Sequence, residues 1–415
     1  MPKVKGINVN QSQQAVLTIN GGSSSIKFAL YQIGEPIDRI LSGKIERIGL
    51  SAATLSFKKK NQSQQIGNIS ISDYRSAVDF LLDWLEQNIN FSTLSAVGHR
   101  VAHGMGYTES QIISQSVLNE LHRISTYDPQ HMPGELKLIE KFRQHYPQLP
   151  QVACFDTAFH QSLPRVAKLL PIPRRFDAIG IQRYGFHGLS YAYLIQQLER
   201  VAGTKVSQGR VILAHLGNGA SVAAVRHGQS IDTSMGFTPA GGVPMGSRSG
   251  DLDPGVAWYM MQSENLSAEQ FNHLINYESG LLGVSELSSD MQDLIEQQKT
   301  DTRAAEAVDL FCYQIKKCIG AYSGVLGGLD TLVFSGGIGE HAALIRARIC
   351  SELEFFGINI DQKSNEDNAA TISTQTSQVT VRVMHTDEEL MIASSVSQLL
   401  ARSNEKETQD GFNNN

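Results

Sequence analysis

Short apolar runs that end in glycine- and serine-rich turns recur along the chain. Residues 15–19 and 26–31 have the composition of two strands, and the turn 20–25 between them has few bulky side chains. Residues 211–227 repeat this arrangement around a second small-residue turn at 217–221. Two copies of strand, turn and strand predict a duplicated domain whose two turns face one ligand cleft.

Longer stretches between these strands place apolar residues three and four positions apart, which is the spacing of one helix face. We predict a helix that starts from a cap at Ser72, and a second over residues 304–322 that leads into a strand at 331–334. Thr386 and Glu389 predict a capping box at the start of a C-terminal helix. Strands, helices and glycine-rich turns in alternation are typical of an α/β protein.

The length of 415 residues is enough for two hydrophobic cores. Apolar residues make up 41% and charged residues 18%, and the formal net charge of −6 gives no sign of nucleic-acid binding. No apolar run is long enough to cross a bilayer, and the four cysteines show no CxxC spacing. We therefore expect a cytoplasmic protein with small-molecule chemistry and neither a nucleic-acid nor a membrane partner. The polar ends, 1–14 and 401–415, are predicted to be frayed tails.

Both glycine-rich turns are suited to binding phosphate. Small residues leave the backbone N–H groups accessible, and the serine hydroxyls add further donors. Each phrase alone is equally compatible with an ordinary hairpin turn. The recurrence favours the phosphate interpretation, and the absence of a GxxxxGK[ST] phrase excludes a P-loop enzyme.

A third glycine-rich phrase allows a different reaction class. Residues 337–342 match GxGxxA after a predicted strand, and Asp361 follows at the distance expected of a nicotinamide (NAD) dehydrogenase. The phrase lies late in the chain, and too little chain follows it for the remaining strands of a dinucleotide-binding half. A dehydrogenase is therefore an alternative that the phosphate phrases disfavour.

Two arginines lie in phrases dense with glycine and polar residues: Arg100 in GHRVAHG and Arg248 in GSRSGDLDP. Arginine can hold a carboxylate or a phosphate through two parallel hydrogen bonds. A surface ion pair is the alternative, but the neighbouring glycines allow a ligand to approach closely, which favours binding. We expect Asp251 and Asp253 to cap a helix that follows them.

Three further polar residues lie in loop-like phrases. His131 precedes MPG, and His187 lies in RYGFHG. Neither histidine has the neighbours of a zinc site, so each is either a structural hydrogen-bonding group or a catalytic one. Asp156 follows a short apolar run, as a carboxylate at the end of a strand does in an α/β active site.

Eight phrases occur in order between residues 17 and 393: LTINGGSSSIKF, GHRVAHG, CFDTAFH, RYGFHG, HLGNGAS, MGFTPAGGVPMGSRSGDLDP, VFSGGIGE and TDEELMIA. Together they resemble the acetate kinase family, within the actin, hexokinase and heat-shock ATPase superfamily. The resemblance implies two duplicated actin-like (ribonuclease H-like) α/β domains flanking a nucleotide cleft, usually paired as a homodimer. It assigns residues 15–160 and the C-terminal helix 386–402 to one domain, and residues 161–385, with the adenosine pocket, to the other.

The reaction implied by the resemblance is reversible phosphoryl transfer from ATP to acetate, or to a slightly longer acid such as propionate, which gives an acyl phosphate and ADP. Mg²⁺, which Mn²⁺ can replace, is the implied cofactor, held by Asn20 and Glu388. A carboxylate nucleophile is already ionised at neutral pH, so catalysis would depend on positioning and charge neutralisation rather than on a base. A non-enzymatic, ATP-driven switch of the same fold is an alternative that the arginine phrases disfavour.

The family's functional residues carry over onto the matching phrases. The implied catalytic set is Arg100, His131, Asp156, His187 and Arg248. The acid would be bound by Arg100, Ala102, Gln130, Phe186 and Pro239. The nucleotide would be bound by Lys27, with Ser23 and Ser25 near the phosphates, and by His215, Leu216, Gly217, Asn218, Gly219, Asp290, Met291, Gln292, Gly336, Gly337, Ile338, Gly339 and Glu340.

Several positions depart from the usual family pattern. Ala102 stands in place of a Val and Gln130 in place of a Leu, so the identity of the acid is open. Gln292 replaces an Arg expected to face adenine, and His341 replaces an Asn, so the preferred phosphoryl donor is open as well. The remaining departures, to which the sequence assigns no consequence, are Leu189, Tyr191 and the small run Ala240-Gly241-Gly242.

Overall fold

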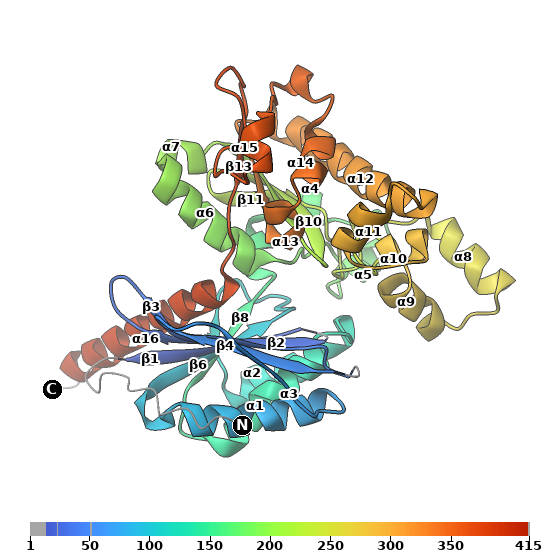
Figure 1. The fold of residues 1–415 in the computed structure, drawn as a ribbon. Coiled ribbons are helices and arrows are strands. Elements are labelled where there is room, and N and C mark those ends of the chain that lie inside the picture. Colours follow the sequence, from blue (N-terminus) through green and yellow to red (C-terminus); the bar gives the residue numbers. More distant parts are fainter. Residues whose placement is uncertain (1–13, 23, 50–51, 414–415) are drawn as a thin grey trace. The chain divides into compact units, whose positions relative to one another are not determined.

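The protein, described by a computed structural model over residues 14–22, 24–49 and 52–413, divides into two compact units (Figure 1). Unit 1 runs to Ala158 and resumes at Asp387, whereas unit 2 comprises Phe159–Thr386. The chain therefore leaves unit 1 once and returns to it with the C-terminal helix.

Unit 1 is built on a mixed eight-stranded sheet with the order β5-β4-β3-β2-β1-β6-β8-β7. Its strands are β1 (Ala15–Gly21), β2 (Ser25–Gln32), β3 (Asp38–Glu46), β4 (Thr54–Lys59), β5 (Gln65–Asn68), β6 (Leu94–Val101), β7 (Gln111–Ile112) and β8 (Gln151–Phe155). β1 pairs antiparallel with β2 and parallel with β6. The hairpin predicted around residues 20–25 is therefore confirmed.

Helices pack on both faces of this sheet. They are α1 (Tyr74–Asn88), α2 (Gln115–Ile124), α3 (Met132–His145) and α16 (Glu388–Asn413). Alternate residues of β1 share one core with α1 and α3, whereas α16 packs against β1 and β6. An added Cβ at Gly98 of β6 would lie 2.5 Å from Cγ2 of Ile392, so only glycine lets α16 approach this strand so closely.

Two predicted helix caps are wrong by one residue. α1 is capped by Asp73, not Ser72, and the Asp73 carboxylate accepts from the third backbone N–H of the helix. α16 begins after Asp387, not Thr386, and Oδ1 of Asp387 accepts from the third N–H of that helix (2.9 Å). Aspartate is at least as good an N-cap as serine or threonine, so the sequence alone did not separate the neighbours.

The predicted tails have different outcomes. The predicted C-terminal tail is wrong over residues 401–413, because α16 continues to Asn413, and residues 414–415 lie outside the described part of the chain. Residues 1–13 of the predicted N-terminal tail lie outside the described residues.

Unit 2 repeats the strand order of unit 1. Its five-stranded sheet runs β11-β10-β9-β12-β13. The strands are β9 (Arg210–Leu216), β10 (Ala220–Arg226), β11 (Gln229–Thr233), β12 (Thr331–Ser335) and β13 (Thr380–Val383). β9 pairs antiparallel with β10 and parallel with β12, as β1 does with β2 and β6. The duplicated α/β architecture is therefore confirmed.

The helices of unit 2 form layers on both faces of its sheet. They are α4 (Arg165–Lys168), α5 (Arg174–Asp177), α6 (Gly188–Ala202), α7 (Thr204–Ser207), α8 (Pro254–Ser263), α9 (Ala268–Tyr277), α10 (Gly280–Ser285), α11 (Met291–Gln297), α12 (Thr302–Leu326), α13 (Gly336–His341), α14 (Ala343–Cys350) and α15 (Gln362–Glu366). Along β9, Val211 and Leu213 pack with α6, whereas Ile212 and Ala214 pack with α12. The continuous apolar run of β9 is thus explained by burial of both faces.

The aspartates of the second arginine phrase have separate roles. Asp253 caps α8 as predicted, because its Oδ1 accepts from the N–H of Gly255 (2.6 Å). The same prediction is wrong for Asp251, whose Oδ1 accepts from the N–H of Gly242 (2.8 Å) inside the loop. Asp251 therefore holds the glycine-rich loop that precedes Arg248.

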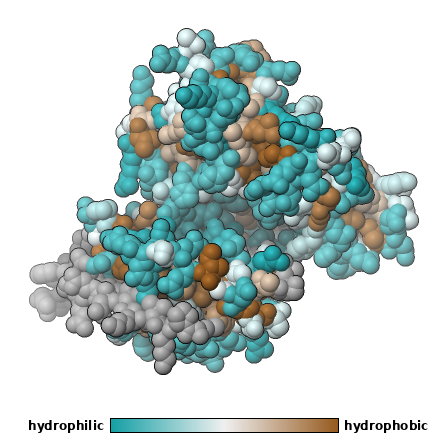
Figure 2. All heavy atoms as spheres, viewed as in Figure 1, coloured by the Kyte–Doolittle hydropathy of each residue, from teal (hydrophilic) through white to brown (hydrophobic). Residues whose placement is uncertain are grey.

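Hydrophilic side chains predominate on the face drawn in Figure 2, and hydrophobic ones form small separate patches. Among the residues that the structure describes, no helix combines the length and the apolar character needed to cross a membrane.

Candidate active site

The two predicted phosphate-binding turns occupy corresponding places, at the tips of the β1–β2 and β9–β10 hairpins. In unit 1 the N–H of Gly22 donates to the carbonyl of Ser25 (2.8 Å), whereas Ser23 lies outside the described residues. In unit 2 the N–H of Gly217 donates to the carbonyl of Gly219 (3.1 Å). Both tips are tight turns of small residues, which leaves room for a ligand at each.

Asn20, near the end of β1, faces two carboxylates at the start of α16. Its Nδ2 donates to Oε2 of Glu388 (2.9 Å) and to Oε1 of Glu389 (3.1 Å). The structure thus brings the predicted pair Asn20 and Glu388 into contact, and it adds Glu389, which the sequence had placed in a capping box. Burial lowers the pKa of Lys27, but the negative charges of Glu388 and Glu389 outweigh this and raise it.

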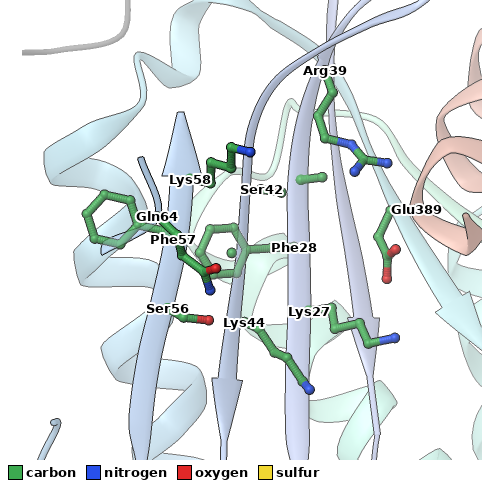
Figure 3. A pocket seen from close by; sticks show the side chains of 12 residues that line it. Lys27, Phe28, Arg39, Ser42, Lys44, Ser56, Phe57, Lys58, Gln64 and Glu389 are labelled. Atoms are coloured by element: carbon green, nitrogen blue, oxygen red, sulfur yellow. The ribbon is translucent and has the colours of Figure 1, made fainter. Parts of the chain in front are cut away.

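A cavity of about 270 Å³ opens beside Lys27 on the same sheet (Figure 3). Lys27, Lys44 and Lys58 line it from three adjacent strands, and Glu389 lines it from α16. Lys27 and Lys44 are direct cross-strand partners. Because like charges repel across strands, this surface favours an anionic ligand near Lys27.

Arg100, at the end of β6, is held by two buried carboxylates. Its Nε and Nη2 donate to Oδ2 of Asp156 (3.0 and 2.6 Å), and its Nη1 donates to Oε1 of Glu135 (2.8 Å) and to the carbonyl of Gly21 (3.3 Å). Four of the five guanidinium N–H groups are therefore used within the described part of the protein. The two-bond grip on an acid that the sequence suggested is not available to Arg100, which offers a ligand one N–H and its charge.

The other residues around Arg100 include one that the sequence did not reveal. Asp156 directly follows β8, so the predicted strand-end carboxylate is confirmed. Glu135 was missed, although its Oε2 accepts from the N–H of Ala102 (2.9 Å). Burial raises the pKa of Glu135 to about 8, while the charge of Arg100 acts in the opposite direction. Its position one helical turn after His131 is the sequence signal that could have found it.

His131 precedes α3 and is oriented by Asp128, a second residue that the sequence missed. Nδ1 of His131 lies 3.0 Å from Oδ1 of Asp128. Burial raises the pKa of Asp128, but the hydrogen bond and charge of His131 outweigh it, so this pKa lies below its ordinary value. With Nδ1 engaged by a carboxylate, Nε2 of His131 is the nitrogen that can contact a ligand. Ala102 is buried and Gln130 is half-buried.

In unit 2, His187 is fixed at the start of α6 by a chain of hydroxyl groups. Its backbone is left-handed (φ 60°), and its Nδ1 lies 2.9 Å from Oγ of Ser221. The hydroxyl of Tyr191 hydrogen-bonds the same Ser221 oxygen, which gives this departure from the family pattern a structural role. The ring of His187 also stacks on His215, with ring centroids 4.3 Å apart.

Arg248 and His187 converge on the tip of the β9–β10 hairpin. A Cβ added to Gly219 would lie 3.3 Å from Nε2 of His187 and 3.5 Å from Nη2 of Arg248. Nη1 of Arg248 donates to the carbonyl of Pro239 (2.9 Å), and Phe186 is buried in the core of unit 2. The predicted residues of unit 2 thus place an imidazole and a guanidinium on one glycine turn.

A larger cavity, of about 640 Å³, brings together residues from three separate predicted phrases. Its lining is Gly217, Asn218, Ser289, Asp290, Met291, Gln292, Ile295, Gly337, Ile338, His341, Ala342, Ala343 and Leu344. Asp290 caps α11, because its Oδ1 accepts from the N–H of Gln292 (2.7 Å). Met291 and Ile338 were predicted, whereas Ile295, Ala342, Ala343 and Leu344 were not, because aliphatic residues near helix ends carry no chemical signature in the sequence.

The remaining predicted nucleotide residues of unit 2 do not line this cavity. A Cβ on Gly336 would lie 2.7 Å from the carbonyl oxygen of Leu216, so this glycine serves close backbone packing. Oε1 of Glu340 accepts from the N–H of Gly336 (2.9 Å) and its Oε2 contacts Nδ1 of His385 (2.8 Å). His215 bonds Ser190 (Nδ1 to Oγ, 2.8 Å). These residues make contacts with the surrounding chain of unit 2 and do not line the cavity.

The GxGxxA phrase does not have a dinucleotide-binding arrangement. β12 is followed in its sheet by β13 at the edge, and the opposite side of the sheet is antiparallel. The carboxylate of Asp361 caps α15, where its Oδ1 accepts from the N–H of Ser364 (2.9 Å). The dehydrogenase alternative is therefore not supported.

The sequence profile of the Acetokinase family matches residues 15–394 of the chain. The chain is 43% identical over 390 residues to a propionate kinase of Salmonella typhimurium, with 92% of this chain and 96% of the relative covered. It is 42% identical over 397 residues to an acetate kinase of Rhodopseudomonas palustris, with 92% and 98% covered.

Two solved structures are similar along nearly the whole chain. A propionate kinase of Francisella tularensis has a TM-score of 0.85 and 35% identity, with 92% of this chain and 98% of that chain covered. The acetate kinase of Porphyromonas gingivalis has a TM-score of 0.83 and 37% identity, with 93% and 100% covered.

Proposed function

We propose, on the premise that this chain belongs to the Acetokinase family, that unit 1 binds the acid and the metal ion and that unit 2 binds the nucleotide. The chain is an ATP-dependent kinase that phosphorylates a short-chain carboxylate. An oxygen of the acid attacks the γ-phosphorus, the bond to the bridging oxygen breaks, and ADP leaves. The observation that most supports the division is the cavity in unit 2 lined by the Gly217, Asp290 and Gly337 phrases.

The acid is assigned to the surroundings of Arg100. Asp156 and Glu135 hold the guanidinium rigidly, so a substrate carboxylate meets a cation that is already oriented. The remaining N–H of Arg100 and Nε2 of His131 bind the carboxylate of the acid and orient its oxygen for attack on the phosphoryl group. Because the acid is ionised at neutral pH, no group needs to remove a proton from it.

The metal is assigned to Asn20 and Glu388, and the residues present fit Mg²⁺. The Asn20 amide donates through Nδ2 to both Glu388 and Glu389, which leaves its oxygen for a ligand. Oxygen donors from one amide and one or two carboxylates suit Mg²⁺, which keeps several waters and binds substrate phosphates. When bound, the ion would neutralise charge on the β- and γ-phosphates. Mn²⁺ accepts the same donors.

The nucleotide is assigned to the larger cavity and the tip beside it. The apolar side chains Met291, Ile295 and Ile338 give the base a wall of the kind typical of ligand sites. The backbone at Gly217 and Gly219 approaches the phosphates closely, with His187 and Arg248 beside that turn. These two side chains would stabilise the charge on the transferring phosphoryl group.

We assign an acid slightly longer than acetate as a substrate of this site. Ala102 is 1% exposed and stands where the family pattern has a larger Val. The two missing methyl groups enlarge the pocket, so propionate should be used about as well as acetate. Hydrophobic pockets discriminate weakly against one methylene, by about 1–3 kcal/mol at most.

We also propose a cytoplasmic homodimer. The four cysteines of the chain are free, which suits a reducing compartment. We assign ATP as the phosphoryl donor. In unit 2, α8 has no buried residue, and Trp258 and Tyr259 on it are 68% and 66% exposed. A second copy of the chain is the occupant that best suits two adjacent exposed aromatic side chains.

Substitution of the two arginines tests the division of labour. Arg248→Ala and Arg100→Lys should each lower kcat by about 10²–10³-fold, because transition-state charge contacts are lost. Lysine is chosen at Arg100 because alanine would leave buried Asp156 and Glu135 without a cation. The exposed Arg123 and Arg303 provide matched alanine controls in units 1 and 2. A near-normal kcat in either active-site variant would contradict the assignment.

A further inference from the structure

Glu135 is a buried carboxylate that takes no direct part in the proposed reaction. Its side chain is 2% exposed, and it lies in the first turn of α3, where the sequence shows only the start of a helix. A buried carboxylate is costly unless it is paired and hydrogen-bonded. The contacts that it makes therefore indicate what it is for.

Both oxygens of Glu135 bind the end of β6. Oε1 accepts from Nη1 of Arg100 (2.8 Å), and Oε2 accepts from the backbone N–H of Ala102 (2.9 Å). One carboxylate thus fixes both the cation assigned to the acid's charge and the residue assigned to its alkyl chain. Asp156 also holds Arg100, but from the other edge of the guanidinium, through Nε and Nη2.

The charge of Glu135 also affects the affinity for the acid, because the acid is an anion. The charged and titratable groups that face it are Arg100 from β6, Asp156 after β8, Asp128 before α3 and Tyr74 from α1. Burial raises the pKa of Glu135 to about 8, and Asp128 and Asp156 act in the same direction, while Arg100 lowers it. Above that pH the carboxyl is ionised, and Arg100 then has two full negative charges beside it.

We propose that Glu135 is a positioning residue that sets the affinity for the acid, by orienting Arg100 and Ala102 and by changing the net charge around Arg100. The proposal rests on the proposed function, because it assumes that the acid binds at Arg100. Its consequence is a KM for the acid that rises with pH while the KM for ATP does not. The acid itself is ionised throughout this range, so its own titration cannot produce the rise.

The first measurement needs no substitution. The KM of the wild-type protein for acetate or propionate should rise by roughly tenfold between about pH 7 and pH 9, since each pH unit above a controlling pKa changes the protonated fraction tenfold. A KM for the acid that is flat or falls over this range overturns the proposal.

The second measurement uses Glu135→Gln. The amide does not titrate, and like the protonated carboxyl it is neutral, so Arg100 keeps the charge of Asp156 alone beside it at every pH. The KM for the acid should therefore stay near the wild-type value at about pH 7 and should no longer rise with pH, so that at about pH 9 it lies roughly tenfold below that of the wild type, with the KM for ATP unchanged. Glu140→Gln, at an exposed position of α3, is the matched control and should behave as the wild type.

Arg100→Lys separates a failure of the inference about Glu135 from a failure of the proposed acid site. If Arg100→Lys is impaired while Glu135→Gln keeps the wild-type KM and pH profile, the inference about Glu135 is wrong and the proposed acid site stands. If Arg100→Lys has wild-type kinetics, the acid does not bind at Arg100, and the proposed function of this site fails first.

Discussion

In the proposed acid site, Ala102 connects backbone position with choice of substrate. Its N–H is fixed by Glu135, so its side chain is presented from a held backbone rather than from a mobile loop. The absence of two methyl groups relative to the usual Val therefore leaves space that neighbouring residues cannot easily fill, because protein interiors resist collapse around small voids.

The substitution Ala102→Val tests this reading of the pocket. It should lower kcat/KM for propionate relative to acetate by roughly tenfold, since one methylene is worth about 1–3 kcal/mol of discrimination. Ala96→Val, at a buried position of β6, which ends just before Ala102, controls for overpacking and should leave the ratio unchanged. An unchanged ratio in Ala102→Val would show that Gln130 or another residue, and not Ala102, sets the preference between the two acids.

Individual site residues could be predicted from sequence when their phrase carried its own signal. Arg100 and Arg248 lie among glycines, and Asp156 ends a strand, so each was recognisable. Glu135 and Asp128 were missed. The bond of Glu135 to Arg100 exists only after α3 packs beside β6, so its spacing from His131 was the signal available in the sequence, and Asp128 lies in a loop phrase in which its bond to His131 is not marked. The prediction that Arg100 holds the acid through two hydrogen bonds was wrong, because most of its N–H groups already donate to Asp156 and Glu135.

At the scale of elements, periodicity located strands and helices well and their ends less well. The runs 15–19 and 211–216 became β1 and β9 because both strands are buried on two faces. The caps of α1 and α16 were each misplaced by one residue. Adjacent Ser, Thr and Asp residues have similar capping ability, so the choice depends on tertiary partners such as the Arg39 side chain that contacts Asp387.

Helix α11 allows a test of the nucleotide site. Gln292 lies at its start and is exposed, with Nε2 donating to Oε1 of Glu296 (3.2 Å). Gln292→Arg should lower the KM for ATP more than that for GTP and leave kcat unchanged, because a cation over the base adds about 1–2 kcal/mol. Gln297→Arg, at the other end of α11, should change neither KM. Tight, strictly ATP-specific turnover in the wild type would contradict the role given to Gln292.

At the scale of the whole molecule, the duplication was visible in sequence as two similar hairpins, and the structure extends it to five corresponding strands in each sheet. Unit 1 adds β4, β5 and β7, and the edge strands β5 and β7 were not predicted. They are short, at 4 and 2 residues, and β5 is exposed along its length. Short exposed strands lack the apolar alternation on which such predictions depend.

The proposed dimer is tested by light scattering on the purified protein. The chain has a mass of 45.5 kDa, so the wild type should scatter as a particle of twice that mass. Trp258→Glu should shift the protein towards the monomer, because it places a charge in an apolar contact. Phe355→Glu is the matched control, since Phe355 is 76% exposed elsewhere in unit 2. A monomeric wild type would rule out the dimer.

The reaction itself is tested most directly by trapping its product. The purified protein is incubated with ATP, Mg²⁺ and either acetate or propionate in the presence of hydroxylamine, and hydroxamate and ADP are measured together. We predict hydroxamate from both acids in equal molar amount to ADP, and none when the metal or the acid is omitted. Hydrolysis of ATP without hydroxamate, or hydroxamate formed with pyrophosphate but not with ATP, would contradict the assignment of this protein as an ATP-dependent carboxylate kinase.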